Sequence, residues 1–509
     1  MSAATVTVPE AEHLDLEAAV RGILNRRPAV GLAVGVVRGD RLEFFSAHGL
    51  ADIATGRPVA EDTVFRVGSL TKTFTAIAVM QLVEQGLVDL NAPANDYLRA
   101  FRLLPVDPTW RPATVRHLLT HTAGIREVLH PSGVARELFG ETVRVGRPLP
   151  SLARYYGPGL RIVAEPGTRW RYTDHGFATL GQLVEDVTGR PFDRYLREHL
   201  FAPLGMTDTD LVPSEAARAR LATGYDLRSS GPEPHPDYEV VTAGGGGAYS
   251  TPRDMARYLA ALLGGGSNEH GSVLEPATLA TMFEPQYQPD PRIPGLGLAF
   301  FRGNAGGHAV LEHQGVVPAF TSQIFLAPDD GLAVMAFTNG TGNGMFWLPT
   351  ETGRLFNHLI GAPDDAIRTD VPHHPEIWAD LCGWYPLAGP LTDVRARGML
   401  GAGVEVFVRG GRLSFRCLSP LPALLKGLPL HPDDPEDPYA FRFEIPGLDV
   451  TMPMIFSREA GKGTTAVHFV VMPFSAEKRD PASPRRWTTG AVRTGAMALA
   501  GRRNGRASG

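Results

Sequence analysis

Ser69 and Lys72 lie three residues apart at the start of a predicted helix, and their side chains give the first indication of chemistry in the chain. Residues at this spacing share one face of a helix, so the lysine amine can reach the serine hydroxyl. The helix N-terminus adds positive potential, which favours negative charge on the serine oxygen and disfavours a protonated lysine. This is the arrangement that an activated serine nucleophile needs.

Lysine is scarce in this chain, which makes Lys72 stand out. The 509 residues include 49 basic side chains, of which four are lysines and the other 45 are arginines, and Lys72 is the only lysine among the first 425 residues. Arginine stays charged near neutral pH and cannot accept a proton, whereas a desolvated lysine amine can become neutral. A second Ser-x-x-Lys match, Ser475 to Lys478, has no apolar helical stripe behind it, so we interpret it as a solvated segment.

Two further polar segments offer partners for a nucleophile. Tyr172 and Asp174 lead into a predicted helix, and His313 and Gly315 come just before the strand-like run 316–326. Glycine at such a point allows another backbone to approach closely. Taken singly, Tyr172 is typical of a half-buried core tyrosine and His313 of a structural histidine. Together with the Ser-x-x-Lys pair, they favour a catalytic site.

The apolar periodicity predicts an α+β layout, in which a sheet made from both ends of the chain encloses a helical middle. Strands are expected at 30–37, 41–47, 296–302, 320–326 and 332–338, and the wider run 316–326 is strand-like. Helices are expected from Leu14 onward and at 69–85, 177–187 and 255–263, the last opened by Thr251, Pro252 and Asp254. We interpret the glycine run 244–247 as a flexible loop, since no Lys-Ser/Thr follows it as a phosphate-binding loop requires.

A second, smaller region follows a linker predicted at 363–376, where Pro, Asp and His break all periodicity. Short strands expected at 404–408, 412–416, 441–445 and 467–472 indicate a small β-barrel or sandwich. The end of the chain, residues 481–509, is basic, and we expect it to be a disordered tail.

Composition excludes several classes of protein. With 43% apolar and 20% charged residues, and a net charge of −5, the chain is typical of a globular protein and offers no global charge for binding nucleic acid or an anionic membrane. The two cysteines, Cys382 and Cys417, imply no disulfide framework or zinc cluster. The N-terminus lacks the features of a secretory signal, and no apolar run approaches eighteen residues, so we expect a cytoplasmic protein.

The order Ser69-x-x-Lys72, Tyr172-x-Asp174, His313-x-Gly315 resembles the three motifs of serine β-lactamases and penicillin-binding proteins, in the branch of class C enzymes and their esterase and D-peptidase relatives. Supporting segments are 65–69 (FRVGS), 118–124 (LLTHTAG) and 246–256 (GGAYSTPRDMA). The likeness covers about residues 14–360. It implies an α+β catalytic domain at 1–362, with an antiparallel sheet and a helical region, and a lipocalin-like β-barrel domain at 377–480.

The resemblance also implies roles for the motif residues. Ser69 would be the acylated nucleophile, and Lys72 the amine that takes or relays its proton. Tyr172 would be a second acid/base near the leaving group, and His313 the catalytic residue of the third motif. The remaining residues would bind substrate or form the oxyanion hole, which uses backbone amides: Asp174, Gly315 and Val316, with the amide of Ser69. No metal or organic cofactor is implied.

Two departures from the family pattern bear on the substrate. Many relatives have Asn where this chain has Asp174, and an ionised Asp cannot donate to a substrate amide carbonyl and would hold Lys72 protonated. Penicillin-recognising enzymes have Lys where this chain has His313, and a neutral histidine attracts a substrate carboxylate less strongly. Both departures weaken a β-lactam assignment and favour esters.

We therefore expect a serine hydrolase or acyltransferase that forms an acyl-serine intermediate with small esters, amides or peptides bearing D-residues. Two alternatives remain open: a stand-alone penicillin-binding-protein-type thioesterase that offloads and cyclises nonribosomal peptides, and a catalytically silent peptide-binding protein. The expected partner is a small-molecule ester, amide or peptidyl substrate, with no nucleic acid or membrane, and the oligomeric state is left open.

Overall fold

The computed structural model describes residues 15–27, 29–126, 141–341, 344–363, 366–388, 397, 400–419, 422–446, 450–470 and 473–479. The chain divides into two compact units, residues 1–365 and 366–509. The basic tail predicted at 481–509 lies outside the described residues.

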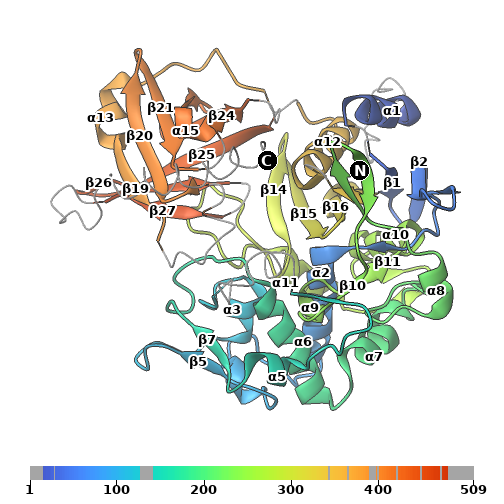
Figure 1. Ribbon diagram of the computed structural model, residues 1–509. Helices are drawn as coiled ribbons and strands as arrows, with labels where there is room; N and C mark the ends of the chain where they lie inside the picture. Colours follow the sequence, from blue (N-terminus) through green and yellow to red (C-terminus); the bar gives the residue numbers. More distant parts are fainter. Residues whose placement is uncertain are drawn as a thin grey trace, which may run out of the picture. The chain divides into compact units, whose positions relative to one another are not determined.

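The first unit is built on a seven-stranded antiparallel sheet, in the order β14-β15-β16-β17-β1-β2-β3 (Figure 1). Its central pair, β1 and β17, joins the start of the chain to a segment 300 residues later, with Leu32 opposite Thr338. This confirms the predicted sheet made from both chain ends. The strands are β1 (Gly31–Arg38), β2 (Arg41–Asp52), β3 (Arg57–Pro58), β14 (Phe301–Ala305), β15 (His308–Val317), β16 (Phe320–Ala327) and β17 (Leu332–Thr338).

Both faces of this sheet are covered by helices, so its central strands are apolar throughout. Val34 and Val36 pack with α1 (Leu16–Arg26) and α12 (Gly344–Ile360) on one face. Ala33 and Val37 belong to the larger core on the other face, which includes α10 (Pro252–Leu263) and the helical region. Thr251 caps α10 by accepting from the N–H of Asp254, as the sequence predicted.

The helix that carries Lys72 lies in the middle of the larger core. A short 3-10 turn, η1 (Gly68–Leu70), runs directly into α2 (Thr71–Glu84), and every residue of α2 from Thr71 to Leu82 is buried. A helix with apolar residues all round is expected to be enclosed by other elements. Here the neighbours include α6 (Asp174–Thr188) and α9 (Ala243–Gly246).

The strand predicted at 320–326 is confirmed as β16, whereas the strand predicted at 296–302 and the strand-like run 316–326 differ from the structure in detail. The run 316–326 is not one strand, because Pro318 and Ala319 form the turn of a hairpin between β15 and β16. The run 296–302 folds back on itself: Leu296 bridges to Phe301, Ala299 has a positive φ of 67°, and the strand begins only at Phe301. Pro318, which cannot donate to a strand ladder, marks the turn in the run 316–326, whereas the largely apolar run 296–302 gives no such sign.

The second unit contains two antiparallel sheets in its described residues. One comprises β19 (Gly383–Pro386), β20 (Gly403–Arg409), β21 (Arg412–Cys417) and β22 (Leu428–Pro429). The other comprises β23 (His431–Pro432), β24 (Ala440–Ile445), β25 (Val450–Glu459), β26 (Gly463–Phe469) and β27 (Ser475–Glu477). The rings of Phe415 and Phe443, one from each sheet, contact each other at 4.6 Å between centroids. The described strands form two sheets, and they do not show the closed barrel that the resemblance implies; the strand pattern itself indicates a barrel or a sandwich.

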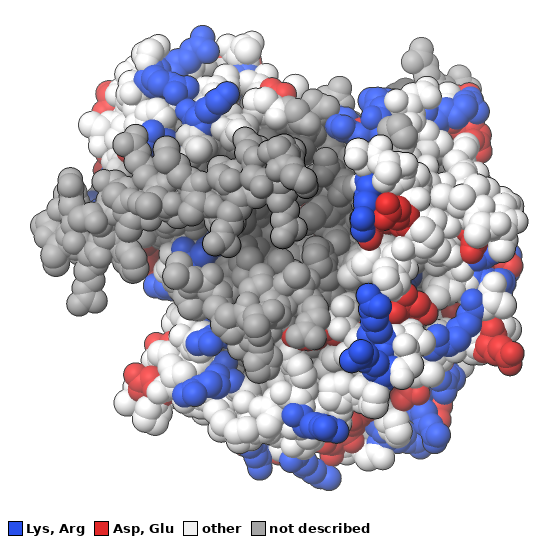
Figure 2. All heavy atoms as spheres, viewed as in Figure 1, with Lys and Arg blue, Asp and Glu red and all other residues white. Residues whose placement is uncertain are grey.

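Among the described residues, no helix is long and apolar enough to cross a membrane. On the face of the molecule that Figure 2 shows, basic and acidic side chains are interspersed over the described surface. Such mixing gives no extended field of one sign on that part of the surface.

Two glycines let η1 and β15 approach each other closely. A Cβ on Gly68, whose φ is +54°, would lie 2.9 Å from the amide nitrogen of Val316. A Cβ on Gly315 would lie 2.0 Å from the carbonyl oxygen of Val67 and 2.3 Å from Ser322 Oγ. Both distances are too short for a real Cβ atom. At these two positions only glycine allows β15 to lie this close to the segment that carries Ser69.

We predict that Gly315→Ala lowers the free energy of unfolding of the first unit by about 2 kcal/mol or more, because the backbones must separate to admit the methyl group. Gly303→Ala is the matched control, since its Cβ would meet only Val310 at an ordinary 3.7 Å, and we expect a change within about 0.5 kcal/mol. Denaturant unfolding of both variants measures this. Equal stability of the two variants would contradict the close approach.

Candidate active site

Ser69 and Lys72 lie where the 3-10 turn becomes a helix. Ser69 is the middle residue of η1 and Lys72 the second residue of α2, so both lie in the first turns of one continuous helical segment. Ser69 keeps 8% of its surface exposed, whereas Lys72 is completely buried. The predicted contact between them is present, with Lys72 Nζ 2.9 Å from Ser69 Oγ.

The amine of Lys72 is held by three oxygen atoms. Besides Ser69 Oγ, it donates to Asp174 Oδ1 at 2.5 Å and to the carbonyl oxygen of Gly245 at 2.6 Å. The carboxylate and the carbonyl only accept, so each takes one N–H. In the charged form, the third proton of Lys72 points to Ser69 Oγ; in the neutral form, the lone pair points there instead and can take the serine proton. The geometry therefore suits both protonation states.

Asp174 and Tyr172 reach Lys72 from the N-terminus of α6. Asp174 is the first residue of this helix, after Thr173 as N-cap, and is largely buried. The ring of Tyr172 lies beside the amine, with Lys72 Nζ 4.7 Å from the ring centroid. Tyr172 and Asp174 of the second motif thus both lie next to Lys72 Nζ of the first motif.

His313 lies within β15, not ahead of a strand as the sequence suggested, and it is buried. Its Nδ1 is 2.8 Å from the carbonyl oxygen of Gln314, which accepts only, so Nδ1 carries the proton. Burial, and to a lesser degree the Lys72 charge, lower the pKa of His313 to about 3, so the ring is neutral at physiological pH. It supplies no positive charge for binding a carboxylate.

The amide of Val316 is free to face Ser69. Val317 and Phe320 close the hairpin as a hydrogen-bonded pair, so Gly315 and Ser322 form the next such pair and the N–H of Val316 points away from β16. On the other edge, β14 pairs with β15 only as far as Glu312. Since the Val316 nitrogen also lies beside Gly68, its N–H is near the amide of Ser69, as an oxyanion hole requires.

The glycine run 244–247 is a short buried helical turn, α9, and not the flexible loop that the sequence suggested. Its carbonyl groups point at α2: Gly245 accepts from Lys72, and Gly244 accepts from Thr75 Oγ1 at 2.7 Å. A Cβ on Gly245 would lie 2.8 Å from the carbonyl oxygen of Asp174. The glycine run therefore allows close packing around Lys72. A run of glycines in a sequence is equally compatible with close packing and with a flexible loop, so the sequence alone does not distinguish them.

His121, like the glycine run, was given no role in the site by the sequence analysis. It is buried, and its ring stacks on Tyr172 with 4.3 Å between centroids and 27° between planes. Its carbonyl oxygen accepts from the N–H of Arg171 at 2.7 Å, and its Nδ1 accepts from the N–H of Thr173 at 3.3 Å. Its place in the supporting segment 118–124 was the only sign in the sequence.

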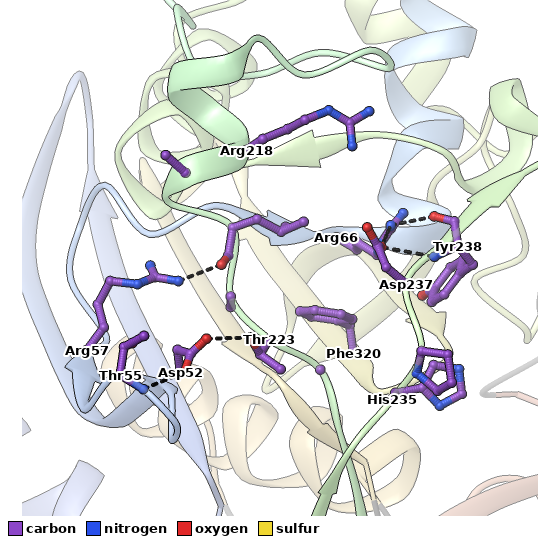
Figure 3. Close-up of a pocket in the computed structure, with 15 residues that line it drawn as sticks. Asp52, Thr55, Arg57, Arg66, Arg218, Thr223, His235, Asp237, Tyr238 and Phe320 are labelled. Carbon is purple, nitrogen blue, oxygen red and sulfur yellow. Dashed lines mark hydrogen bonds and ion pairs between the residues drawn. The ribbon is translucent and has the colours of Figure 1, made fainter. Parts of the chain in front are cut away.

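A pocket of about 370 Å³ lies beside the segment that leads into η1 (Figure 3). None of the predicted site residues is among the described residues that line it. Arg66, buried in its wall, donates to Asp237 Oδ1 and to the carbonyl oxygen of Tyr238, both at 2.5 Å. The hydroxyl of Tyr238 in turn donates to the carbonyl oxygen of Pro318 at 2.8 Å. These bonds connect the chain before η1 to the β15–β16 hairpin.

The second Ser-x-x-Lys match lies on a strand. Ser475 begins β27, where its hydroxyl contacts His468 Nδ1 at 2.7 Å, and Lys478 follows the strand and bonds to the carbonyl oxygen of Asp380. Ser475 and Lys478 therefore do not share a helical face. In the described parts of the chain, no group of three or more His, Cys, Asp or Glu side chains is placed to hold a metal ion.

Comparisons with known proteins agree with this geometry. The sequence profile described as Beta-lactamase matches residues 16–354. Penicillin-binding protein 4 of Amycolatopsis lactamdurans is 30% identical over 352 residues, which is 66% of this chain and 85% of that protein. Esterase EstB of Burkholderia gladioli is 34% identical over 210 residues, 40% of this chain and 52% of that protein.

Solved structures extend the likeness to both units. The crystal structure of SurE with D-Leu covers 91% of this chain and 98% of its own, with a TM-score of 0.59 and 22% identity, which shows a shared fold. The profile match over two thirds of the chain shows the family. The chain belongs to the β-lactamase family of serine hydrolases.

Proposed function

We propose that this protein hydrolyses or transfers acyl groups from esters and amides through an acyl-Ser69 intermediate. The observation that carries the proposal is the buried amine of Lys72, which is held by Asp174 and Gly245 so that its third position faces Ser69 Oγ. A buried amine fixed in this way can take a proton from the serine as the bond to the acyl carbon forms.

The proposed reaction uses the site residues in turn. Ser69 Oγ attacks the acyl carbon while its proton passes to the neutral amine of Lys72, and the amides of Ser69 and Val316 stabilise the oxyanion. Tyr172, beside the amine, delivers a proton to the leaving group. Water, an amine or an alcohol then attacks the acyl-serine ester and gives its own proton to the same groups, which restores Ser69.

The substrates we favour are uncharged esters and amides, including peptides with D-residues. Asp174 binds Lys72 and carries no proton to donate, and His313 is neutral, so the described site has no fixed cation besides the paired lysine. One relative is named as an esterase, and the structure of SurE was determined with D-Leu. Both names support small acyl donors, including ones with D-residues.

A second candidate, left open by the sequence, is a stand-alone thioesterase or cyclase for nonribosomal peptides; the likeness over both units to SurE, whose structure was determined with D-Leu, is compatible with a peptidyl substrate that carries a D-residue. This enzyme would use the same acyl-serine, with an amine of the acyl chain in place of water. A peptidyl thioester with a free amine distinguishes the two, because cyclisation gives a product lighter by one water than hydrolysis. The third alternative, a silent binding protein, would form no acyl-serine.

We predict that a fluorophosphonate probe labels Ser69 and that Ser69→Ala abolishes labelling. Lys72→Arg keeps the charge but lacks a removable proton, so we expect the rate of acylation to fall by about a hundredfold or more. Peptide mass mapping and the rate of labelling measure both effects.

Ser475→Ala and Lys478→Arg are matched controls, because they change the second Ser-x-x-Lys match on β27, and we expect normal labelling from both. Labelling that survives in Ser69→Ala, or a Lys72→Arg rate above about a tenth of the wild type, would overturn the proposed mechanism.

A second prediction concerns the neutral ring of His313. In His313→Lys, a fixed positive charge replaces it, and we expect the ratio of kcat/KM for a substrate with a free carboxylate to that of its methyl ester to rise about tenfold. His313→Gln adds no charge and should change this ratio by less than about threefold. An unchanged ratio in His313→Lys would show that this position does not face the substrate carboxylate.

We also propose that the second unit is a lipocalin-like barrel over residues 377–480. Two contacts at the sheet edges support closure: Arg479 N–H donates to the carbonyl oxygen of Trp384 at 2.9 Å, and the chain passes from β22 to β23 through Leu430, whose N–H donates to Leu413. In a closed barrel, the amide of Arg479 should exchange its hydrogen at least about a hundredfold more slowly than that of Gly410 in an exposed turn. Similar rates would favour two open sheets.

A further inference from the structure

Tyr172 is held by hydrogen bonds on both sides of its position in the chain. The N–H before it, of Arg171, donates to the carbonyl oxygen of His121 at 2.7 Å, and the N–H after it, of Thr173, donates to His121 Nδ1 at 3.3 Å. One residue therefore fixes the backbone that carries Tyr172. Because a backbone N–H only donates, Nδ1 must be the unprotonated nitrogen of the ring.

The same imidazole also contacts the phenol ring itself. It stacks on Tyr172 at 4.3 Å between centroids, and Lys72 Nζ lies 4.7 Å from the centroid of that phenol ring. The ring of Phe177, in the first turns of α6, lies 5.0 Å from the imidazole. The stacked ring and the two bonded amides together restrict both the place and the tilt of Tyr172 beside the lysine.

The backbone alone does not account for a histidine at this position. His121 has a positive φ of 56°, in the left-handed region where glycine and asparagine are more readily accommodated. The backbone bond from Arg171 to its carbonyl would form with any residue. The features that need an imidazole are the bond to Thr173 and the stack on Tyr172.

We propose that His121 is a positioning residue that holds the phenol of Tyr172 for proton delivery to the leaving group. This inference rests on the proposed function, in which Tyr172 is that proton donor. His121 itself does not touch the reacting atoms; it acts through Tyr172.

The test compares two esters with the same acyl group. An alkyl ester needs a proton on its departing oxygen, whereas p-nitrophenolate leaves without one. In His121→Gly, which suits the positive φ, we expect kcat for the alkyl ester to fall at least about tenfold with KM within about twofold, and kcat for the p-nitrophenyl ester to fall less than about threefold. Tyr172→Phe should show the same pattern. His121→Asn, which tolerates this φ and offers an oxygen to Thr173, should recover part of the loss.

His117→Asn is the matched control. Four residues earlier, the Nδ1 of His117 accepts from the N–H of Thr114 at 3.2 Å, in the capping box of α3 (Val115–Leu119). We expect it to affect both esters alike. Equal losses on the two esters in His121→Gly and His121→Asn would overturn the positioning role, whether or not thermal stability falls. Failure of the proposed function is separate, since wild-type Ser69 would then not be labelled by fluorophosphonate.

Discussion

The structure of the first unit depends on a buried amine that must be paired. Removing a lysine charge from water costs several kcal/mol unless it is fully hydrogen-bonded, and Lys72 has no exposed surface. Its partners come from three separate elements: Ser69 from η1, Asp174 from α6 and Gly245 from α9. The amine of Lys72 therefore has all its hydrogen-bond partners only when η1, α6 and α9 are assembled around it. The candidate site is in this sense part of the core.

Close packing around the amine explains where glycine occurs. Gly245 has no room for a Cβ beside Asp174, and Gly315 has none beside Val67. The first lets a carbonyl oxygen reach Lys72, and the second lets β15 bring the N–H of Val316 to η1. In the proposed mechanism these backbone groups hold the amine and form the oxyanion hole, and they can reach their positions only because glycine has no side chain there.

The sequence predicted the sheet from both chain ends and the contact of Ser69 with Lys72, because periodicity and helical spacing are local signals. The sequence-based predictions failed where one local pattern is compatible with two different backbone structures. The largely apolar run 296–302 looks the same whether it is one strand or folds back on itself, and the glycines at 244–247 suit either a flexible loop or a tight buried turn. The stack of His121 on Tyr172 joins residues 51 positions apart, and no spacing rule reveals such a contact.

Charge in the site sets what can bind there. Lys72 and Asp174 form an ion pair at 2.5 Å, and the neighbouring His313 is neutral because burial, and to a lesser degree the Lys72 charge, lower its pKa. A substrate carboxylate entering such a site would lose its hydration without gaining a cation in return. In the proposed reaction, an uncharged acyl donor meets no such penalty, and the oxyanion would be stabilised as the transition state develops by the amides of Ser69 and Val316. The pairing that makes the lysine tolerable in the core therefore supports the proposal that neutral esters and amides are the substrates.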